Sequence, residues 1–243
     1  MACIIKQVYV LPHRQTQGSP ESLVVFRGWQ VQVPDYIVIQ CRHKRLNISV
    51  EGTGSPGKYI VVDSTGAKVY GEGKCKVRQH EWSKHCTCRK SHLAVDEHTG
   101  VIESCVMTTN SVDNGTMAGI LLDGMEGEVK KMAGDRGYDH NKAYEQLSKR
   151  KIKPVIPPRQ NARIKKHGNS RGRQLERDKA IRRIRKVGRK RLKKQSGYYR
   201  RSIAESIMFR LKNQFGEKLS SRENEQQQVG VRIRCYVLNR GPK

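Results

Sequence analysis

Apolar residues fall into short runs along most of this chain, and these runs predict strands. Residues 59–62 (Tyr-Ile-Val-Val) form an apolar run that ends at Asp63, which indicates a buried strand. The turn-prone residues 64–66 follow, so residues 67–70 are expected to be the hairpin partner of this strand. Four further strands are predicted at residues 91–95, 101–108, 128–133 and 154–156.

Two segments have helical spacing instead, residues 138–150 and residues 198–212. At about 100° per residue, one phenol, two cations and one carboxylate of the second helix share a stripe roughly 60° wide. These residues are Tyr198, Arg201, Glu205 and Lys212. Beside the stripe lies an apolar face suited to docking on a core, formed by Ala204, Met208, Leu211 and Phe215.

The order of these elements predicts the fold class. Three antiparallel-type strands followed by alternating strands and helices indicate an α/β protein with a mixed sheet flanked by helices. Residues 1–57 are broken into short pieces by Gly and Pro, and they contain no complete helix-turn-helix pattern. We therefore expect a partial N-terminal region at 1–57 and one folded domain at 58–243, a length that is enough for a proper core.

Charge points to a polyanionic partner. The formal net charge of +27 is far more than solubility requires, and nucleic acid is the natural partner for it. A basic surface that is simply solvated is the plainer alternative. Residues 159–201 hold 19 Lys and Arg but only two acidic residues, and such a block follows phosphate backbones without sequence preference. A nuclear or nucleolar signal has the same appearance.

Cysteine usage and hydropathy indicate the compartment. The seven cysteines are scattered and odd in number, which argues against a disulfide framework and for a reducing cytosol. The first residues lack the apolar region of a signal peptide, and no run of about 18 apolar residues exists to span a membrane. Cys and His are dense between Cys75 and Cys88, where zinc is one interpretation. The Cys-x-Cys spacing favours incidental loop residues, and His92 is expected to be structural.

Three carboxylates stand out as candidate chemistry. Asp63 and Asp135 follow strands, where rigid backbone can hold a catalytic group, and Glu205 lies on the second helix. Brought together, three hard oxygen ligands would suit two Mg²⁺ or Mn²⁺ ions acting on a phosphodiester. Taken singly, each aspartate is more often a turn or cap residue and a helical glutamate is usually a solvated ion-pair partner.

The contexts of these residues resemble DDE transposases of bacterial insertion sequences, most closely insertion sequence family five. The resemblance covers roughly residues 10–240, and it includes the signature Tyr-x2-Arg-x3-Glu-x6-Lys, complete from Tyr198 to Lys212. The other similar blocks are residues 61–66 (Val-Val-Asp-Ser-Thr-Gly), 89–96 (Arg-Lys-Ser-His-Leu-Ala-Val-Asp), 134–139 (Gly-Asp-Arg-Gly-Tyr-Asp) and 155–159 (Val-Ile-Pro-Pro-Arg).

The resemblance implies an RNase H-like fold in which Asp63, Asp135 and Glu205 bind two Mg²⁺ or Mn²⁺ ions. The implied reaction is hydrolysis at the element's ends, followed by attack of the freed 3′-hydroxyl on target DNA. A basic insertion at residues 159–197 would precede the last catalytic helix. The residues expected to bind DNA are Tyr198, Arg201, Lys212, Arg189, Lys190 and Arg191.

The resemblance also sets out the partners and the alternatives. Transposon ends and target DNA are the expected partners, in the bacterial cytoplasm at the nucleoid, and a homodimer on paired ends is compatible with them. Only 62 residues precede Asp63, so the N-terminal part is expected to be truncated. The alternative function is accordingly a non-catalytic DNA-binding remnant that inhibits a full-length transposase. A basic ribosomal or RNA-binding protein would explain the charge but not the carboxylate motifs.

Overall fold

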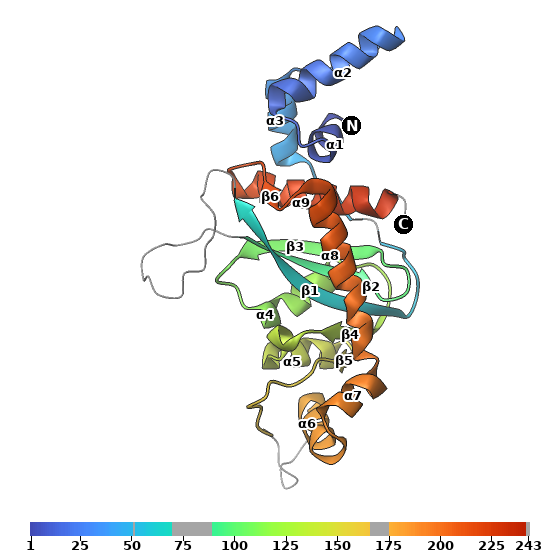
Figure 1. The fold of residues 1–243 in the computed structure, drawn as a ribbon, viewed down its shortest axis with the longest axis vertical. Helices are drawn as coiled ribbons and strands as arrows, with labels where there is room; N and C mark the ends of the chain where they lie inside the picture. Colours follow the sequence, from blue (N-terminus) through green and yellow to red (C-terminus); the bar gives the residue numbers. More distant parts are fainter. Residues whose placement is uncertain (51, 70–88, 166–174, 242–243) are drawn as a thin grey trace.

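A six-stranded mixed sheet forms the centre of the computed structural model, which describes residues 1–50, 52–69, 89–165 and 175–241 (Figure 1). Its main path runs β3-β2-β1-β4-β5, and β6 pairs with the far end of β1. The first three strands are antiparallel, whereas β4, β5 and β6 run parallel to their neighbours. The strands are β1 (Lys58–Val69), β2 (Arg89–Asp96), β3 (Ile102–Thr109), β4 (Val129–Gly134), β5 (Lys153–Val155) and β6 (Lys218–Leu219).

Most of the predicted strands are confirmed, but the predicted hairpin is wrong. The strands expected at 91–95, 101–108, 128–133 and 154–156 correspond to β2, β3, β4 and β5 within a few residues. Residues 67–70 were expected to turn back as a partner strand, yet β1 continues without a turn to Val69. The reason is pairing with β2, since Ser64, Thr65 and Gly66 lie opposite three consecutive β2 residues in an unbroken ladder. Tertiary pairing thus overrides the turn preference of these residues.

Strand alternation gives the sheet two apolar faces. Ile60 and Val62 point to one face, where they pack with residues of α4 (Asn114–Asp123) and α5 (Asn141–Lys149). Val61 points to the opposite face, which is covered by α8 (Ser202–Phe215) and α9 (Asn224–Arg240). The mixed α/β sheet flanked by helices is therefore confirmed. The helix predicted at 138–150 is α5, and α4 was not predicted.

The apolar face predicted on the second helix is confirmed. Ala204, Met208, Leu211 and Phe215 are all buried in the cluster between α8 and the sheet, together with Ile207. The first turn of the predicted helix differs, because residues Tyr198–Arg201 form a 3-10 helix, η2, before α8 begins. A 3-10 turn advances by about 120° per residue instead of 100°. Residues three apart in a 3-10 helix eclipse each other, so Tyr198 lies directly over Arg201 and stays in the predicted stripe.

Helices also form where the sequence predicted little structure. In residues 1–57, α1 (Ala2–Val8), α2 (His13–Arg27) and α3 (Tyr36–Arg45) are present, and Asp35 caps α3 by accepting the Ile37 N–H at 2.7 Å. An apolar cluster joins α1 and α3 to α9. The basic block contains α6 (Glu176–Val187) and α7 (Arg189–Ser196). Figure 1 shows α1–α3 and α6–α7 at opposite ends of the long axis.

No helix within the described ranges is long and apolar enough to cross a membrane.

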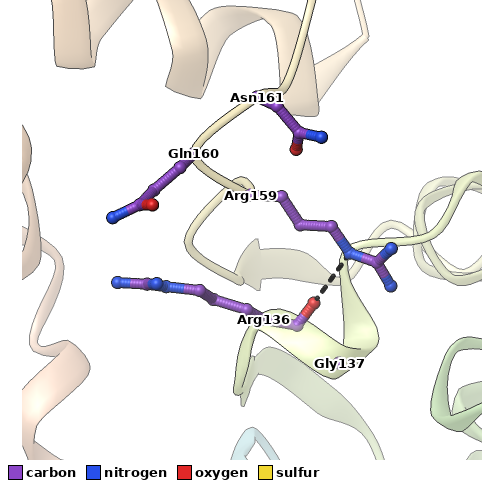
Figure 2. A pocket seen from close by; sticks show the side chains of 5 residues that line it. All are labelled: Arg136, Gly137, Arg159, Gln160 and Asn161. Atoms are coloured by element: carbon purple, nitrogen blue, oxygen red, sulfur yellow. Dashed lines mark hydrogen bonds between the residues drawn. The ribbon is translucent and has the colours of Figure 1, made fainter.

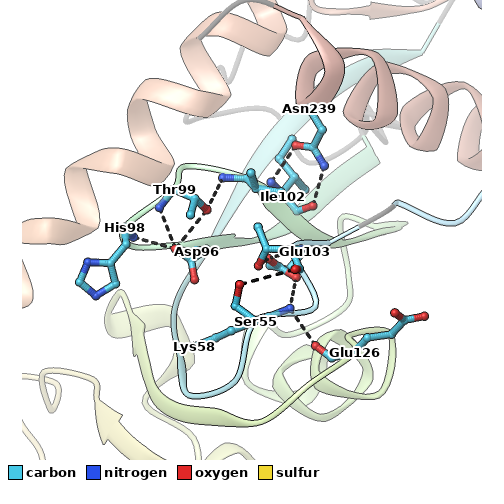
Figure 3. A network of polar contacts seen from close by, with 11 residues as sticks. Ser55, Lys58, Asp96, His98, Thr99, Ile102, Glu103, Glu126 and Asn239 are labelled. Atoms are coloured by element: carbon cyan, nitrogen blue, oxygen red, sulfur yellow. Dashed lines mark hydrogen bonds and ion pairs between the residues drawn. The ribbon is translucent and has the colours of Figure 1, made fainter.

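A buried ion pair closes the end of the sheet where β1 begins (Figure 3). The Lys58 ammonium donates to Glu103 Oε2 at 2.5 Å, and both side chains are fully buried. Lys58 also donates to the Glu126 carbonyl oxygen, and Glu103 accepts the N–H and hydroxyl of Thr53. The charges are therefore paired and their remaining hydrogen-bonding groups are used, which a buried ion pair needs in order to be tolerated.

Replacing one member of this pair is expected to destabilise the fold strongly. Glu103→Leu leaves the Lys58 ammonium buried without a countercharge, and the free energy of unfolding should fall by about 3–5 kcal/mol. The double variant Lys58→Met with Glu103→Leu should recover most of that loss. Denaturant unfolding measures both, with Glu176→Gln in an exposed ion pair as the control. A loss below about 1 kcal/mol in Glu103→Leu would contradict the assignment.

Candidate active site

Asp63 lies within β1, on the face of the sheet that α8 covers. Alternation along the strand places Asp63 on the same side as Val61, which belongs to the apolar cluster beneath α8. The prediction that Asp63 ends its strand is wrong, because β1 continues to Val69. Its carboxylate accepts the Ser64 N–H at 2.9 Å, which fixes its orientation. Asp63 is thus held by an ordered backbone on both sides.

Asp135 directly follows β4, as predicted, and reaches the same face. In the parallel register, Val62 lies opposite Gly134, so Asp63 and Asp135 are next to each other on adjacent strands. The Asp135 carboxylate accepts the Gly137 N–H at 2.9 Å and caps the short 3-10 helix η1 (Arg136–Tyr138). A Cβ atom at Gly134 would lie 3.0 Å from Val62 Cγ2, so a larger residue here would require the Val62 side chain to shift.

Arg201 joins the sheet to the catalytic helix candidate. Its Nη1 donates to Asp63 Oδ2 at 2.9 Å, and its Nη2 donates to Glu205 Oε1 one helical turn further along. The Arg201 and Asp63 side chains are 19% and 13% exposed, whereas Glu205 is 56% exposed. A partly buried guanidinium therefore bridges two carboxylates that are 142 residues apart in the chain.

The charges of the three carboxylates influence one another. Burial raises the pKa of Asp63, and the negative charges of Asp135 and Glu205 raise this pKa further. The Ser64 N–H and the Arg201 guanidinium act in the opposite direction. The three carboxylates predicted from the sequence thus lie within electrostatic range of each other. A cation at this place relieves their repulsion, and Arg201 is that cation here.

The donor set suits a divalent metal ion, although the contacts shown are made to Arg201. Across the described ranges, no three His, Cys, Asp or Glu side chains are arranged to hold a metal ion. The guanidinium lies between Asp63 and Glu205, where it satisfies their oxygens. Hard carboxylate oxygens are the ligands that Mg²⁺ and Mn²⁺ prefer, and the carboxylates here face each other across a site already filled by positive charge.

The other predicted site residues divide into those near the carboxylates and those away from them. Two cations lie over the Tyr198 ring: Lys193 Nζ is 4.7 Å and Arg201 Cζ is 5.9 Å from the ring centroid. Burial raises the pKa of the Tyr198 hydroxyl. Lys212 is not brought to this group, since its ammonium pairs with Glu217 at 3.8 Å. Two turns of α8 separate Lys212 from Glu205. The two residues therefore share a face of the helix, but Lys212 lies away from the carboxylates.

The basic residues predicted to bind DNA lie on α7. Lys190 and Arg191 are exposed, and Arg189 donates to the carbonyl oxygens of Pro158 and Arg159. Burial lowers the pKa of Lys193, and the charges of Arg136, Arg189 and Arg201 lower it further. A group of cations therefore borders the carboxylates on the side of α7. Arg136 and Lys193 were missed in the sequence, although Arg136 stands next to Asp135.

A second carboxylate bridge positions the start of η2 and was also missed. Glu97, which is almost fully buried after β2, accepts from Lys131 at 2.9 Å and pairs with Arg200 at 3.4 Å. Lys131 belongs to β4, and Arg200 immediately precedes Arg201. This bridge therefore fixes η2 against the strand that leads to Asp135. Sequence spacing contains no signal for it, because its three residues come from separate elements.

His92 is structural, as expected. It is fully buried in β2, and its ring shares hydrogen bonds with Thr108 Oγ1 at 2.9 Å and the Tyr138 hydroxyl at 3.5 Å. The zinc interpretation rested on Cys75, Cys86 and Cys88, which lie outside the described residues. Their role as metal ligands stays a prediction.

Comparisons with known proteins bear on this site. A family model described as "Transposase DDE domain" matches residues 54–240, and a second model with the same description matches residues 1–72. Among solved structures, a similar chain comes from "Cryo-EM structure of piggyBac transposase synaptic complex with hairpin DNA". The TM-score is 0.43 at 12% sequence identity, and the alignment covers 76% of this chain and 46% of that chain. This chain thus spans less than half the length of that relative.

Protonation of His92 is expected to make stability depend on pH. Burial lowers the pKa of His92 from 6.5 to about 4, so below about pH 6.5 the unfolded chain takes up a proton that the folded chain refuses. The stabilisation is present above pH 6.5 and is lost as the pH falls to about 4, by about 3 kcal/mol in total. Denaturant unfolding across this range should show a smaller loss for His92→Gln. An identical pH dependence in both proteins would contradict this.

Proposed function

The chain belongs to the family of transposase DDE domains, and we propose that it cuts DNA at the ends of an insertion sequence and joins them to target DNA. The observation that carries this proposal is the contact of one partly buried cation, Arg201, with both Asp63 of β1 and Glu205 of α8, at a place where Asp135 is close enough to act on Asp63 electrostatically. Within the family, we assign the chain to the insertion-sequence group with the Tyr-x2-Arg-x3-Glu-x6-Lys signature and to insertion sequence family five.

The proposed cofactors are two Mg²⁺ or Mn²⁺ ions, held by Asp63, Asp135 and Glu205. When bound, these ions supply an activated water or 3′-hydroxyl and stabilise the leaving oxygen of the phosphodiester. The chain's own part is to hold three carboxylates on rigid backbone around the reacting phosphate. Asp63 and Asp135 are mounted on neighbouring strands, and the packed face of α8 fixes Glu205 above them.

Arg201 has two positions in this mechanism. Before metal ions enter, its guanidinium neutralises Asp63 and Glu205. With metal ions held by Asp63 and Glu205, the guanidinium would be released from these oxygens and would be available for a DNA phosphate, which it fits in a bidentate manner. Tyr198 lies against Arg201 and orients it.

The remaining DNA contacts are proposed along the basic segment 159–197. Lys190 and Arg191 are exposed on α7, Arg189 anchors that helix to the loop after β5, and Lys212 extends the cationic surface along α8. Contacts of this kind neutralise phosphates and position the duplex, whatever its sequence.

The proposed architecture is an RNase H-like catalytic domain at 58–243 with an N-terminal region at 1–57. The mixed sheet, with helices on both faces and carboxylates beneath α8, supports it. A homodimer acting on paired DNA ends at the bacterial nucleoid agrees with this function.

Glu205→Gln is expected to abolish cleavage while DNA binding remains. Removing one carboxylate from the metal site should lower cleavage of labelled element-end DNA in Mg²⁺ or Mn²⁺ by roughly 100-fold or more. Binding of the same DNA in EDTA should change less than about twofold, because cation contacts dominate it. Glu145→Gln on α5 is the matched control, since Glu145 is exposed and remote from the site. Equal cleavage by wild type and Glu205→Gln would reject the site, and binding without cleavage by wild type would identify a non-catalytic DNA-binding protein.

Arg201→Gln is expected to strengthen metal binding in the absence of DNA. The guanidinium competes for the oxygens of Asp63 and Glu205, so its removal should lower the dissociation constant for Mn²⁺ by about tenfold. Spin resonance of free Mn²⁺ during titration measures this. Arg200→Gln is the control, because it removes the same charge one residue away and affects Glu97 instead. Unchanged Mn²⁺ affinity in Arg201→Gln would show that Arg201 does not occupy the metal position.

A further inference from the structure

An open cavity of about 610 Å³ lies beside the turn that follows Asp135 (Figure 2). One wall is the turn after β4, with Arg136 and Gly137, and the other is the loop after β5. That loop contributes Arg159, Gln160 and Asn161. Arg159, Gln160 and Asn161 belong to the basic segment that was predicted to bind the DNA backbone, whereas Arg136 and Gly137 were not predicted as part of a site. The cavity adjoins the candidate active site, since Arg136, which lines it, directly follows Asp135 in the chain.

The loop after β5 is fixed through its backbone. The Arg159 N–H donates to Asp139 Oδ2 at 2.8 Å, and Asp139 is itself buried and paired with Arg177 at 2.7 Å. On the other side, Arg189 donates to the Pro158 and Arg159 carbonyl oxygens. The loop is therefore held from η1 and from α7 at once. A site built on backbone that is fixed in this way is preorganised for a ligand.

The side chains that line the cavity have unused binding capacity. Arg136 makes no ion pair with any described residue, and Arg159 makes one long hydrogen bond, from Nε to the Arg136 carbonyl oxygen at 3.5 Å. Gln160 and Asn161 are exposed, and Figure 2 shows their carboxamides above the two guanidinium groups. Among the described residues, no carboxylate lines the cavity. The cavity therefore presents two positive charges and two carboxamides to a ligand.

The two kinds of side chain select different parts of a ligand. Guanidinium groups bind phosphate oxygens with parallel hydrogen bonds. Carboxamides carry both a donor and an acceptor, which a fully ionised phosphate does not need but a nucleobase edge matches. A free phosphate would thus leave Gln160 and Asn161 without a partner. A nucleotide satisfies both pairs, and the volume lies in the range of small-molecule sites.

We propose that this cavity binds one nucleotide of the DNA strand beside the phosphodiester that is cut. The two phosphates that flank this nucleotide lie one on Arg136 and the other on Arg159, because the two guanidinium groups point to opposite sides in Figure 2, and its base edge lies against Gln160 and Asn161. The arginines contribute affinity that is independent of sequence, and the carboxamides contribute a base preference at one position next to the cut. This assignment rests on the proposed function for the identity of the strand, but not for the binding itself.

Metal-free binding of short single strands tests the assignment. The probes are fluorescein-labelled ten-residue strands of deoxyadenosine, thymidine or deoxycytidine, and an abasic strand of equal length. Anisotropy in EDTA at two salt concentrations gives the affinity and its salt dependence without requiring cleavage. The variants are Arg136→Ala with Arg159→Ala, and Gln160→Ala with Asn161→Ala. Lys130→Ala with Lys149→Ala is the matched control, because it removes two exposed charges at remote positions.

The two variants are expected to fail in different ways. The double variant Arg136→Ala with Arg159→Ala should bind all four strands about tenfold more weakly. The slope of log affinity against log salt concentration should fall by about 1.4, since each phosphate contact on a single strand contributes about 0.7. The double variant Gln160→Ala with Asn161→Ala should bind the abasic strand with an affinity within about twofold of wild type. It should bind at least one base-bearing strand about tenfold more weakly. Thermal unfolding midpoints equal to that of wild type show that the variants remain folded.

Two results would overturn the assignment. One is an arginine double variant whose affinity and salt dependence equal those of the Lys130 and Lys149 control. The other is a carboxamide double variant whose affinity for the abasic strand falls as much as its affinity for the base-bearing strands. Because no metal ion is present, an inactive catalytic centre leaves both readouts intact. Failure of the cavity and failure of the transposase function are therefore separable.

Discussion

The arrangement of the site depends on one ion-pair bridge, in which Arg201 holds Asp63 and Glu205 together. Two carboxylates facing each other at a partly buried place repel, and a third at Asp135 adds to the repulsion. Arg201, at the end of η2, contacts both Asp63 and Glu205 and offsets this repulsion, while the apolar face of α8 packs on the sheet. The bridge by Glu97 to Lys131 and Arg200 then fixes η2, so the approach of the helix is determined on both sides.

The remainder of the fold supplies a rigid frame for this bridge. The two apolar clusters clamp β1 and β4 between α4–α5 and α8–α9, so the two aspartates are carried by the best-packed strands of the sheet. Cations lie on α7 and on η1, where burial and the charges of Arg136 and Arg189 lower the pKa of Lys193. Negative charge is thus concentrated inside and positive charge surrounds it. In the proposed function, this arrangement would attract a DNA backbone to the rim and bring the phosphate to be cut to the carboxylates.

The sequence was informative where a single element carries the pattern, and it failed where two elements meet. Strands β2 to β5 and the buried face of α8 follow from periods of 2 and 3.6 residues, which are local properties. The length of β1 was missed because Ser64, Thr65 and Gly66 favour a turn locally and are held straight by β2. Helix α2 was missed because Gly18 and Pro20, which lie inside it, indicate a break. Asp63, Asp135 and Glu205 were predicted from their motif contexts, whereas the bridge by Arg201 and the cavity by Gln160 are products of tertiary packing.

The central claim is that the carboxylates bridged by Arg201 are a metal site for DNA cleavage. Anomalous diffraction at the manganese edge, from crystals grown with Mn²⁺ and DNA, tests it most directly. The account predicts anomalous peaks within coordination distance of Asp63, Asp135 and Glu205, with the Arg201 guanidinium moved from these oxygens to a DNA phosphate. Manganese elsewhere, with Arg201 still bridging Asp63 and Glu205 in the DNA complex, would contradict it.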